Sequence, residues 1–447
     1  MSNVVEFKSL ARPIAHFVRI DSAYKKMGDL YAADQLPVKR VVFDAARIIK
    51  QSELVNAFRN DGVEIVLDTQ VAELAAPAKF KTYVKDTPWA SAAEKGLLDS
   101  TYFDNTISQM DIISWIARFA VENRVDTVLS PTHFLGDRKF DNWMMLDVKS
   151  CAALRDALDK EGGQHIAIDY PVIQSLKSFN GLEFRNEMTE CIRDLPVENV
   201  WIRASGLGNG PKPLVVKQLL SSLYDFQQVN KPIIMDYASG LMGQALVAFG
   251  GVSGIAQGIG EREAFNANSW NDLPKARDSD KPFGRRAYVP ISGLGRRLSK
   301  PELSLLSSAK GGKKYLGCQD SCCQHGVKDM LRDSRQHTVF QAVDPIRELE
   351  KIPDFSREGY FIEKPLQNAE RLARNIKDLN PSQDEAMKLK VNLESLKDRL
   401  SKHHSAIGKF SDVLNIVSDE RGAGGQRAMN CSYRTNLSVN SIIRRGQ

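Results

Sequence analysis

Three of the six cysteines and one of the seven histidines lie within a single ten-residue stretch, GCQDSCCQHG. Thiolates and imidazoles are the ligands that a structural zinc ion takes at four tetrahedral corners. Cys318, Cys322 and Cys323 offer three ligands, and either His325 or the later His337 offers the fourth. Buried free thiols or a reactive pair of cysteines are the alternatives. We favour zinc held by Cys318, Cys322, Cys323 and His337, because a predicted helix after the cluster can return the His337 imidazole to the same ion.

Short apolar runs with strand-like composition recur along the chain, separated by segments long enough for a helix. They are RVVFD (40–44), VEIVLD (63–68), VDTVLS (125–130), QHIAID (164–169), ENVWIR (198–203), KPIIMD (231–236) and GGVSGIAQ (250–257). Continuous apolar runs are typical of parallel strands that are covered on both faces. With a candidate eighth strand at KKYLGC (313–318), the pattern predicts an α/β fold, a (β/α)8 TIM barrel. No G-x-G-x-x-G follows the first run, which disfavours a dinucleotide-binding sheet.

Nearly every run ends in a polar residue. These residues are Asp44, Asp68, Ser130, Asp169, Arg203, Asp236 and Gln257. The carboxyl ends of barrel strands converge on one mouth, where active sites lie. Helix capping accounts for any one of these residues, but a succession of them favours a polar pocket. In such a pocket Asp68 can act as a general acid or base, or accept hydrogen bonds from a nucleobase edge.

The loop after the fifth run is rich in glycine. Its sequence, WIRASGLGNGP (201–211), places Arg203 and Ser205 at a strand end and then Gly206 and Gly208 in the loop. Glycines let backbone amides approach a planar or phosphorylated ligand closely. The alternative is an ordinary flexible connection.

The run that ends at Gln257 is followed by GIGERE, with carboxylates at Glu261 and Glu263. Such carboxylates can serve as acid, base or nucleophile. They can equally lie in the first turn of the next helix, where negative charge interacts favourably with the helix dipole.

Composition and charge indicate a globular protein, with 42% hydrophobic and 26% charged residues and a net charge of +6. Between Lys275 and Lys314 there are eleven basic residues against three acidic ones. That excess of positive charge would favour binding to the phosphate backbone of a nucleic acid. A solvated loop region is the alternative. The first residues show no secretory signal and no apolar stretch is long enough to span a membrane, so we expect a cytoplasmic protein without membrane contact.

The carboxyl-terminal part differs in character from the rest. Leucines and other apolar residues recur at steps of three and four between Leu389 and Val417, which predicts a long amphipathic helix. This helix can pair within the chain, with a second subunit as a homodimer, or with a partner protein. The expected organisation is a barrel over residues 1–300, a zinc-binding lobe over 301–380, the long helix over 381–418 and a flexible basic tail over 419–447.

In their order along the chain, these motifs resemble the tRNA-guanine transglycosylase superfamily, which consists of (β/α)8 barrels with a zinc-binding insertion. EIVLDTQ stands where the family carries a strand ending in D-S-G-G-F-Q, and IRASGLGNG is similar to the family's G-G-L-A-V-G-E loop. The cysteine cluster with His337 takes the place of C-x-C-x-x-C and a later histidine. The segment from KPIIMD to GIGERE is similar in layout to the one that carries the nucleophilic aspartate. The resemblance covers roughly residues 40–380.

The resemblance implies an enzyme of pentosyltransferase type that exchanges or modifies a nucleobase in RNA or DNA, with Zn2+ as a structural ion. It implies catalytic roles for Asp68 as acid or base and for Asp236 or Glu261 as nucleophile. The implied substrate-binding residues are Asp169, Arg203, Ser205, Gly206, Gly208 and Gln257. Where the family places its nucleophile in F-D-C-V, this chain has no carboxylate, because Gln257 stands there. The alternative function is therefore a catalytically inactive barrel that binds nucleic acid or a partner subunit.

Overall fold

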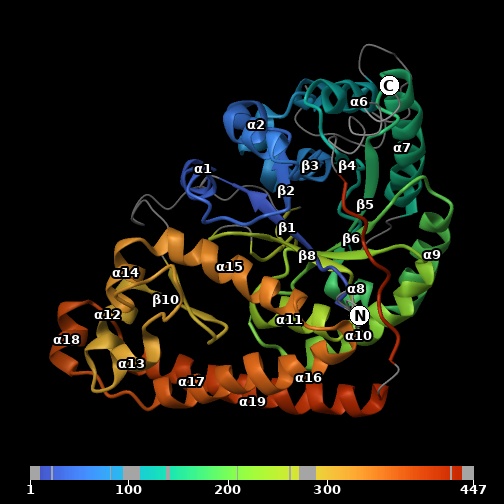
Figure 1. Cartoon of the computed structure of the whole chain (residues 1–447). Helices are drawn as coiled ribbons and strands as arrows, with labels where there is room; N and C mark the ends of the chain where they lie inside the picture. Colours follow the sequence, from blue (N-terminus) through green and yellow to red (C-terminus); the bar gives the residue numbers. More distant parts are fainter. Residues whose placement is uncertain are drawn as a thin grey trace, which may run out of the picture.

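The computed structural model describes residues 11–21, 24–80, 82–93, 111–136, 141–208, 210–260, 263–270, 288–422 and 425–434. Its centre is a closed barrel of parallel strands that pair in chain order (Figure 1). The strands are β1 (Ala15–Ile20), β2 (Arg40–Asp44), β3 (Glu64–Asp68), β4 (Thr127–Leu129), β5 (Ala167–Ser175), β6 (Val200–Ser205), β7 (Ile233–Asp236) and β8 (Gly254–Gly258). β8 closes the barrel against β1, with Ala256 opposite Phe17. The predicted TIM barrel is confirmed.

Helices cover the outside of the barrel between the strands. They are α1 (Tyr24–Ala32), α2 (Ser52–Asn60), α3 (Val71–Leu74), α4 (Pro77–Phe80), α6 (Ile112–Glu122), α7 (Asp141–Lys160), α8 (Leu176–Phe179), α9 (Leu182–Arg193), α10 (Pro213–Phe226) and α11 (Gly240–Ala248). The helix α15 (Ser334–Glu350) packs against both α1 and α11, so it takes the eighth place in the outer ring. In the described part of the chain, no helix is both long and apolar enough to cross a membrane.

The eighth strand is not where the sequence suggested. Residues 313–316 of the run predicted as a strand lie in the helix α13 (Gly312–Leu316). The strand that completes the barrel is β1, near the amino terminus. Its sequence AHFVRI is interrupted by His16 and Arg19, which conceals the strand. Arg19 pairs with Asp68 and Asp236, whereas His16 lies on the opposite face and contacts Gln257.

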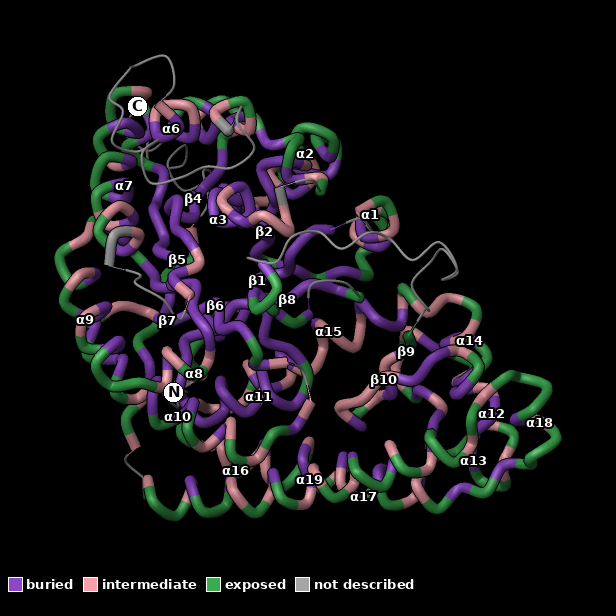
Figure 2. The backbone as a smooth tube through the Cα atoms, turned by 180° about the vertical axis from the view of Figure 1, so that it is seen from behind, coloured by how far each residue is buried: buried purple, intermediate pink, exposed green. Residues whose placement is uncertain are grey.

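The inside of the barrel is filled by apolar side chains from nearly every strand, and Figure 2 shows the barrel strands as buried almost throughout. The ring centroids of Phe17 and Trp201 lie 4.7 Å apart in this layer. Val42 and Val66 face each other in the β2–β3 register. A packed interior of this kind leaves the mouth at the carboxyl ends of the strands as the place for chemistry.

A lobe is inserted between β8 and α15. It contains the hairpin β9 (Tyr288–Ile291) and β10 (Arg296–Ser299), followed by α12 (Lys300–Ser308), α13 and α14 (Val327–Arg332). Ser299 begins α12 with a capping box that Glu302 completes. Because the hairpin packs on α12 and α15, the lobe begins before residue 301, the boundary that the sequence suggested.

The chain continues through α16 (Arg357–Phe361), α17 (Gln367–Lys377) and α18 (Gln383–Lys388) to α19 (Leu393–Arg421). The seam of α19 is buried at Leu396, Leu400, His403, Ile407, Phe410, Leu414 and Val417. It packs on α10 and α17, and Figure 1 shows α19 running along α16 and α17. The apolar seam is therefore packed within the chain. A homodimer or partner contact through α19 would have to use another face of the helix.

Part of the segment predicted as a flexible tail is packed. The backbone N–H of Ala428 donates a hydrogen bond to the carbonyl of Gly250 at 2.9 Å. Cys431 joins the apolar layer inside the barrel, and Arg434 pairs with Glu198 at 2.6 Å. Residues 425–434 thus cross the amino end of the barrel, and the prediction of flexibility is wrong for them; residues 435–447 lie outside the described part.

Candidate active site and metal centre

Two aspartates and two arginines meet inside the carboxyl mouth of the barrel. Arg19 Nη1 lies 2.8 Å from Asp68 Oδ2, and Arg19 Nε and Nη2 lie 2.8 and 2.6 Å from the two carboxylate oxygens of Asp236. Arg203 donates to the same two carboxylates, from Nε to Asp236 at 2.8 Å and from Nη2 to Asp68 at 2.9 Å. We call Arg19, Asp68, Arg203 and Asp236 the charge square. It balances two positive and two negative charges.

The charge square is sealed from solvent. Each of its members is at most 3% exposed. The Tyr237 ring covers both guanidinium groups, at 4.6 Å from Arg19 and 5.6 Å from Arg203. Burial alone would raise the pKa of Asp68, but Arg203 and Arg19 hold it well below its usual range. Asp68 is therefore ionised at neutral pH, which suits it as a charge partner rather than as a proton donor or acceptor.

Asp169 lies away from the charge square. It stands near the start of β5, a strand that extends to Ser175, and its carboxylate accepts hydrogen bonds from Asn199 and from Trp201 Nε1 at 2.9 and 2.7 Å. Burial raises its pKa to about 6. Because the apolar run ends before the strand does, the prediction that Asp169 lies at the carboxyl mouth is wrong.

The loop after β6 holds a neighbouring segment in place. Ser205 Oγ accepts from the backbone of Ala267 at 2.8 Å, and Gly206 donates to the carbonyl of Phe265 at 3.2 Å. Gly206 and Gly208 have φ values of 95° and 68°, a conformation that glycine adopts without strain. The predicted ligand loop thus supports residues 263–270 over the mouth, and whether it also contacts a ligand stays a prediction.

At the end of β8, Gln257 is fixed by two contacts. Its Nε2 lies 2.8 Å from His16 Nε2 and donates to the carbonyl of Ala342 at 2.7 Å. Glu261, predicted as nucleophile alongside Asp236, lies outside the described residues. The neighbouring Glu263 is described and contacts Arg297.

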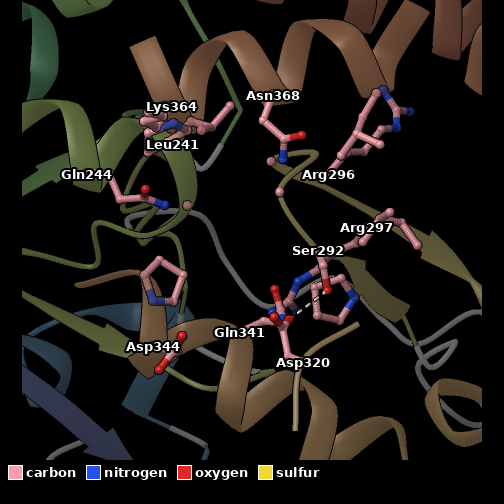
Figure 3. Close-up of a pocket in the computed structure, with 18 of the residues that line it drawn as sticks. Leu241, Gln244, Ser292, Arg296, Arg297, Asp320, Gln341, Asp344, Lys364 and Asn368 are labelled. Carbon is pink, nitrogen blue, oxygen red and sulfur yellow. Dashed lines mark hydrogen bonds between the residues drawn. The ribbon is translucent and has the colours of Figure 1, made fainter. Parts of the chain in front are cut away.

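A groove of about 1410 Å³ opens between the mouth, the inserted lobe and the carboxyl-terminal helices. Figure 3 shows Gln244 from α11, Arg296 and Arg297 from the hairpin, and Asn368 from α17 around it, with Gln341 from α15 on its lower side. Gln257 and Glu263 border it from the barrel. The groove therefore borders the rim of the mouth, and the residues of the charge square do not line it.

The charges that line the groove balance. The basic residues are Arg296, Arg297, Lys314, Lys364, Arg371 and Arg374, and the acidic residues are Glu263, Asp320, Asp344, Glu348, Glu363 and Glu370. Only part of the basic stretch Lys275–Lys314 is described, because residues 271–287 lie outside the described ranges. The described lining therefore suits a neutral polar ligand better than a polyanion.

The predicted metal ligands lie together in the lobe. The ligand atoms of Cys318, Cys322, Cys323 and His337 all lie within 4.8 Å of one another. The sulfur of Cys322 is 3.7 Å from each of the other two sulfurs, and His337 Nδ1 is 3.5 Å from Cys323 Sγ. A tetrahedral ion with metal–sulfur bonds of about 2.3 Å places its sulfurs about 3.8 Å apart. The cluster therefore fits a metal ion, and the predicted grouping is confirmed.

The second nitrogen of His337 supports the same conclusion. Its Nε2 lies 2.8 Å from the carbonyl oxygen of Pro290 in β9. A carbonyl oxygen only accepts, so Nε2 carries the proton and the lone pair of Nδ1 faces the thiols. His325 is not part of the cluster, because it pairs with Asp329 at 3.3 Å.

No family model and no curated protein matches the chain. Among solved structures, it is similar to KGPDC from Streptococcus mutans, with 13% sequence identity and a TM-score of 0.33. That similarity covers 59% of this chain and 95% of the other. A likeness this distant gives no information on chemistry, so the description of the site depends on the geometry above.

Two residues of the mouth were not predicted from the sequence. Arg19 lies on the unrecognised strand β1, and Tyr237 directly follows Asp236. The balance of buried charge could have indicated Arg19. Buried carboxylates at Asp68 and Asp236 require cationic partners, and the single predicted arginine at a strand end, Arg203, does not neutralise both carboxylates.

Proposed function

We propose that the chain is a transglycosylase-like enzyme that exchanges or modifies a nucleobase of a nucleic acid at the mouth of the barrel. The observation that carries this proposal is the convergence of Asp68 and Asp236, from strands on different sides of the barrel, in a mouth whose rim borders a groove. Two carboxylates at one site favour positive charge developing on a sugar as its glycosidic bond breaks.

In the proposed reaction, a carboxylate oxygen of Asp236 attacks C1′ of the target nucleotide. The C1′–N9 bond breaks, its electron pair leaves with the base, and the base takes up a proton. The incoming base then attacks C1′, loses its proton and breaks the C1′–O bond, which regenerates the carboxylate. Asp68 stays ionised and stabilises the charge on the sugar. Tyr237 must leave its place over the guanidinium groups to admit the nucleotide.

The lining of the groove supports a base as the recognised group. Gln244, Gln257, Gln341 and Asn368 border it, and amide side chains can donate to and accept from a base edge. With formal charges in balance, the described groove offers no excess of cations for a long stretch of phosphates. Contacts to the nucleic-acid backbone would then come from outside the groove.

We further propose zinc as the ion of the Cys318, Cys322, Cys323 and His337 site. A set of three thiols and one imidazole is a structural zinc site, with no open position for a reacting water. When bound, the ion would hold the lobe beside the mouth and take no part in the reaction.

A second candidate function is favoured by the state of the charge square. Both carboxylates are neutralised by Arg19 and Arg203 and covered by Tyr237. A barrel in which these groups serve only stability would bind a nucleic acid or a partner without catalysis.

Incorporation of labelled guanine or a 7-deazaguanine into RNA and DNA separates the two candidates. The enzyme proposal expects incorporation by the metal-loaded protein and its loss in Asp236→Asn, with Glu420→Gln as an exposed carboxylate control. Binding without incorporation into either polymer would establish the second candidate instead.

A further inference from the structure

Glu263 is a carboxylate at the mouth with its own cationic partner, separate from the charge square. It is 9% exposed and borders the groove. Its Oε1 accepts a hydrogen bond from the backbone of Gly260 at 2.8 Å and is contacted by the guanidinium of Arg297. Unlike Asp68 and Asp236, it therefore combines burial with a place on the groove wall.

Residues around Glu263 lie over the ends of β6 and β7. Ser239 Oγ donates to the carbonyl of Glu263 at 3.4 Å, and the rings of Tyr237 and Phe265 are 5.3 Å apart. The backbone of Gly206 donates to the carbonyl of Phe265. These contacts bring Glu263 next to the strand end that carries Asp236.

The surroundings of Asp68 and Glu263 shift the pKa values of the two carboxyl groups in opposite directions. The guanidinium groups beside Asp68 keep it ionised, so it cannot deliver a proton to a departing base. Burial raises the pKa of Glu263, while Arg297 lowers it in part. A carboxyl group with a raised pKa can hold a proton closer to neutral pH and release it to a base.

We propose that Glu263 is the proton donor and acceptor of the base exchange, which makes this inference dependent on the proposed function. As the C1′–N9 bond breaks and its electron pair leaves with the base, the Glu263 carboxyl gives its proton to that base. The incoming base then returns a proton to the Glu263 carboxylate as it bonds to C1′. Glu263 ends each exchange as it began.

The metal site is connected to this carboxylate through the hairpin. Arg297 in β10 stands directly opposite Pro290 in β9, and the carbonyl of Pro290 accepts the hydrogen bond from His337. A bound ion that fixes the His337 ring also fixes β9, and with it the strand that presents Arg297 to Glu263. Arg297 is then a positioning residue, and the metal site acts on the mouth through it.

Exchange kinetics test the role of Glu263. Glu263→Gln keeps the size of the side chain, and we expect kcat to fall at least about 100-fold with KM within about threefold. Arg297→Ala removes the group that lowers the pKa of Glu263, so the alkaline limb of the kcat profile should move to higher pH. Glu394→Gln and Arg332→Ala, on exposed helix surfaces, should change neither quantity.

The outcomes are distinguishable. An unchanged kcat in Glu263→Gln, with exchange by the wild type intact, overturns this inference and leaves the proposed function standing. An unmoved alkaline limb in Arg297→Ala overturns the role of Arg297. If the wild type exchanges no base into either polymer, the proposed function itself has failed.

A chemical probe tests the link to the metal without activity. Amidation with a carbodiimide and glycine ethyl ester, followed by peptide mass spectrometry, reports the access of each carboxyl group. Removing the metal by chelation should raise the labelling of Glu263 at least threefold, as Arg297→Ala should, and leave exposed Glu394 unchanged. Labelling of Glu263 that is the same with and without metal would overturn the connection.

Discussion

Removing both members of an ion pair from the charge square should destabilise the fold far less than the sum of the two single removals. Asp68→Asn deletes attractions to Arg19 and Arg203, each on the order of 4 kcal/mol at an effective dielectric constant of about 20. It also relieves the desolvation of Asp68 and its repulsion from Asp236, so we expect a net loss of about 3–5 kcal/mol. Arg203→Met should cost a similar amount. The double variant leaves Arg19 paired with Asp236 and no net charge, and should cost little more than either single variant.

The assay is urea unfolding of the wild type, both single variants and the double variant, followed by circular dichroism and tryptophan fluorescence. We expect a coupling free energy of about 3 kcal/mol between Asp68 and Arg203. The matched control is the exposed pair Lys217 and Glu420, at 2.7 Å, whose coupling should stay below about 1 kcal/mol. Single-variant losses that add to within about 0.5 kcal/mol would refute the charge square as a coupled unit.

Three further predictions concern other parts of the chain. Elemental analysis should find one metal ion per chain, lost in Cys318→Ser and retained in Cys191→Ser, since Cys191 lies outside the cluster. Burial raises the pKa of Glu64 from 4.5 to about 7 in the folded state, so its contribution to stability is present below about pH 4.5 and lost as pH rises through 7. Glu64→Gln should remove this decline, which amounts to about 3 kcal/mol, in urea titrations at several pH values. Phe410→Ala should cost about 3–5 kcal/mol yet leave the molar mass in light scattering unchanged, because this seam residue is buried within the chain.

The metal cluster could be predicted because its ligands are close in sequence. Cys318, Cys322 and Cys323 lie on one loop, and His337 lies on the following helix. A turn closed by the hydrogen bond from the Cys323 backbone to the carbonyl of Asp320, at 3.0 Å, lets the adjacent cysteines face the same point. Local geometry of this kind leaves few alternatives, so residue types and spacing were sufficient.

The mouth could be predicted only in part. The sequence identified Asp68, Arg203 and Asp236 as strand-end residues, but their mutual pairing depends on barrel closure. Arg19 was missed because a charged residue inside a short apolar run argues against a strand, unless partners from distant strands neutralise it. The strand at 313–318 was wrongly predicted because a short apolar run fits a helix and a strand equally well.

The most direct test of the proposed function is to follow the target base and the nucleic-acid chain together. Metal-loaded protein is incubated with isotopically labelled guanine and either RNA or DNA, and the polymer is analysed by mass spectrometry before and after digestion to nucleosides. The proposal predicts labelled base in the polymer with the chain length unchanged. An unlabelled polymer, or one that has only lost bases, would contradict it.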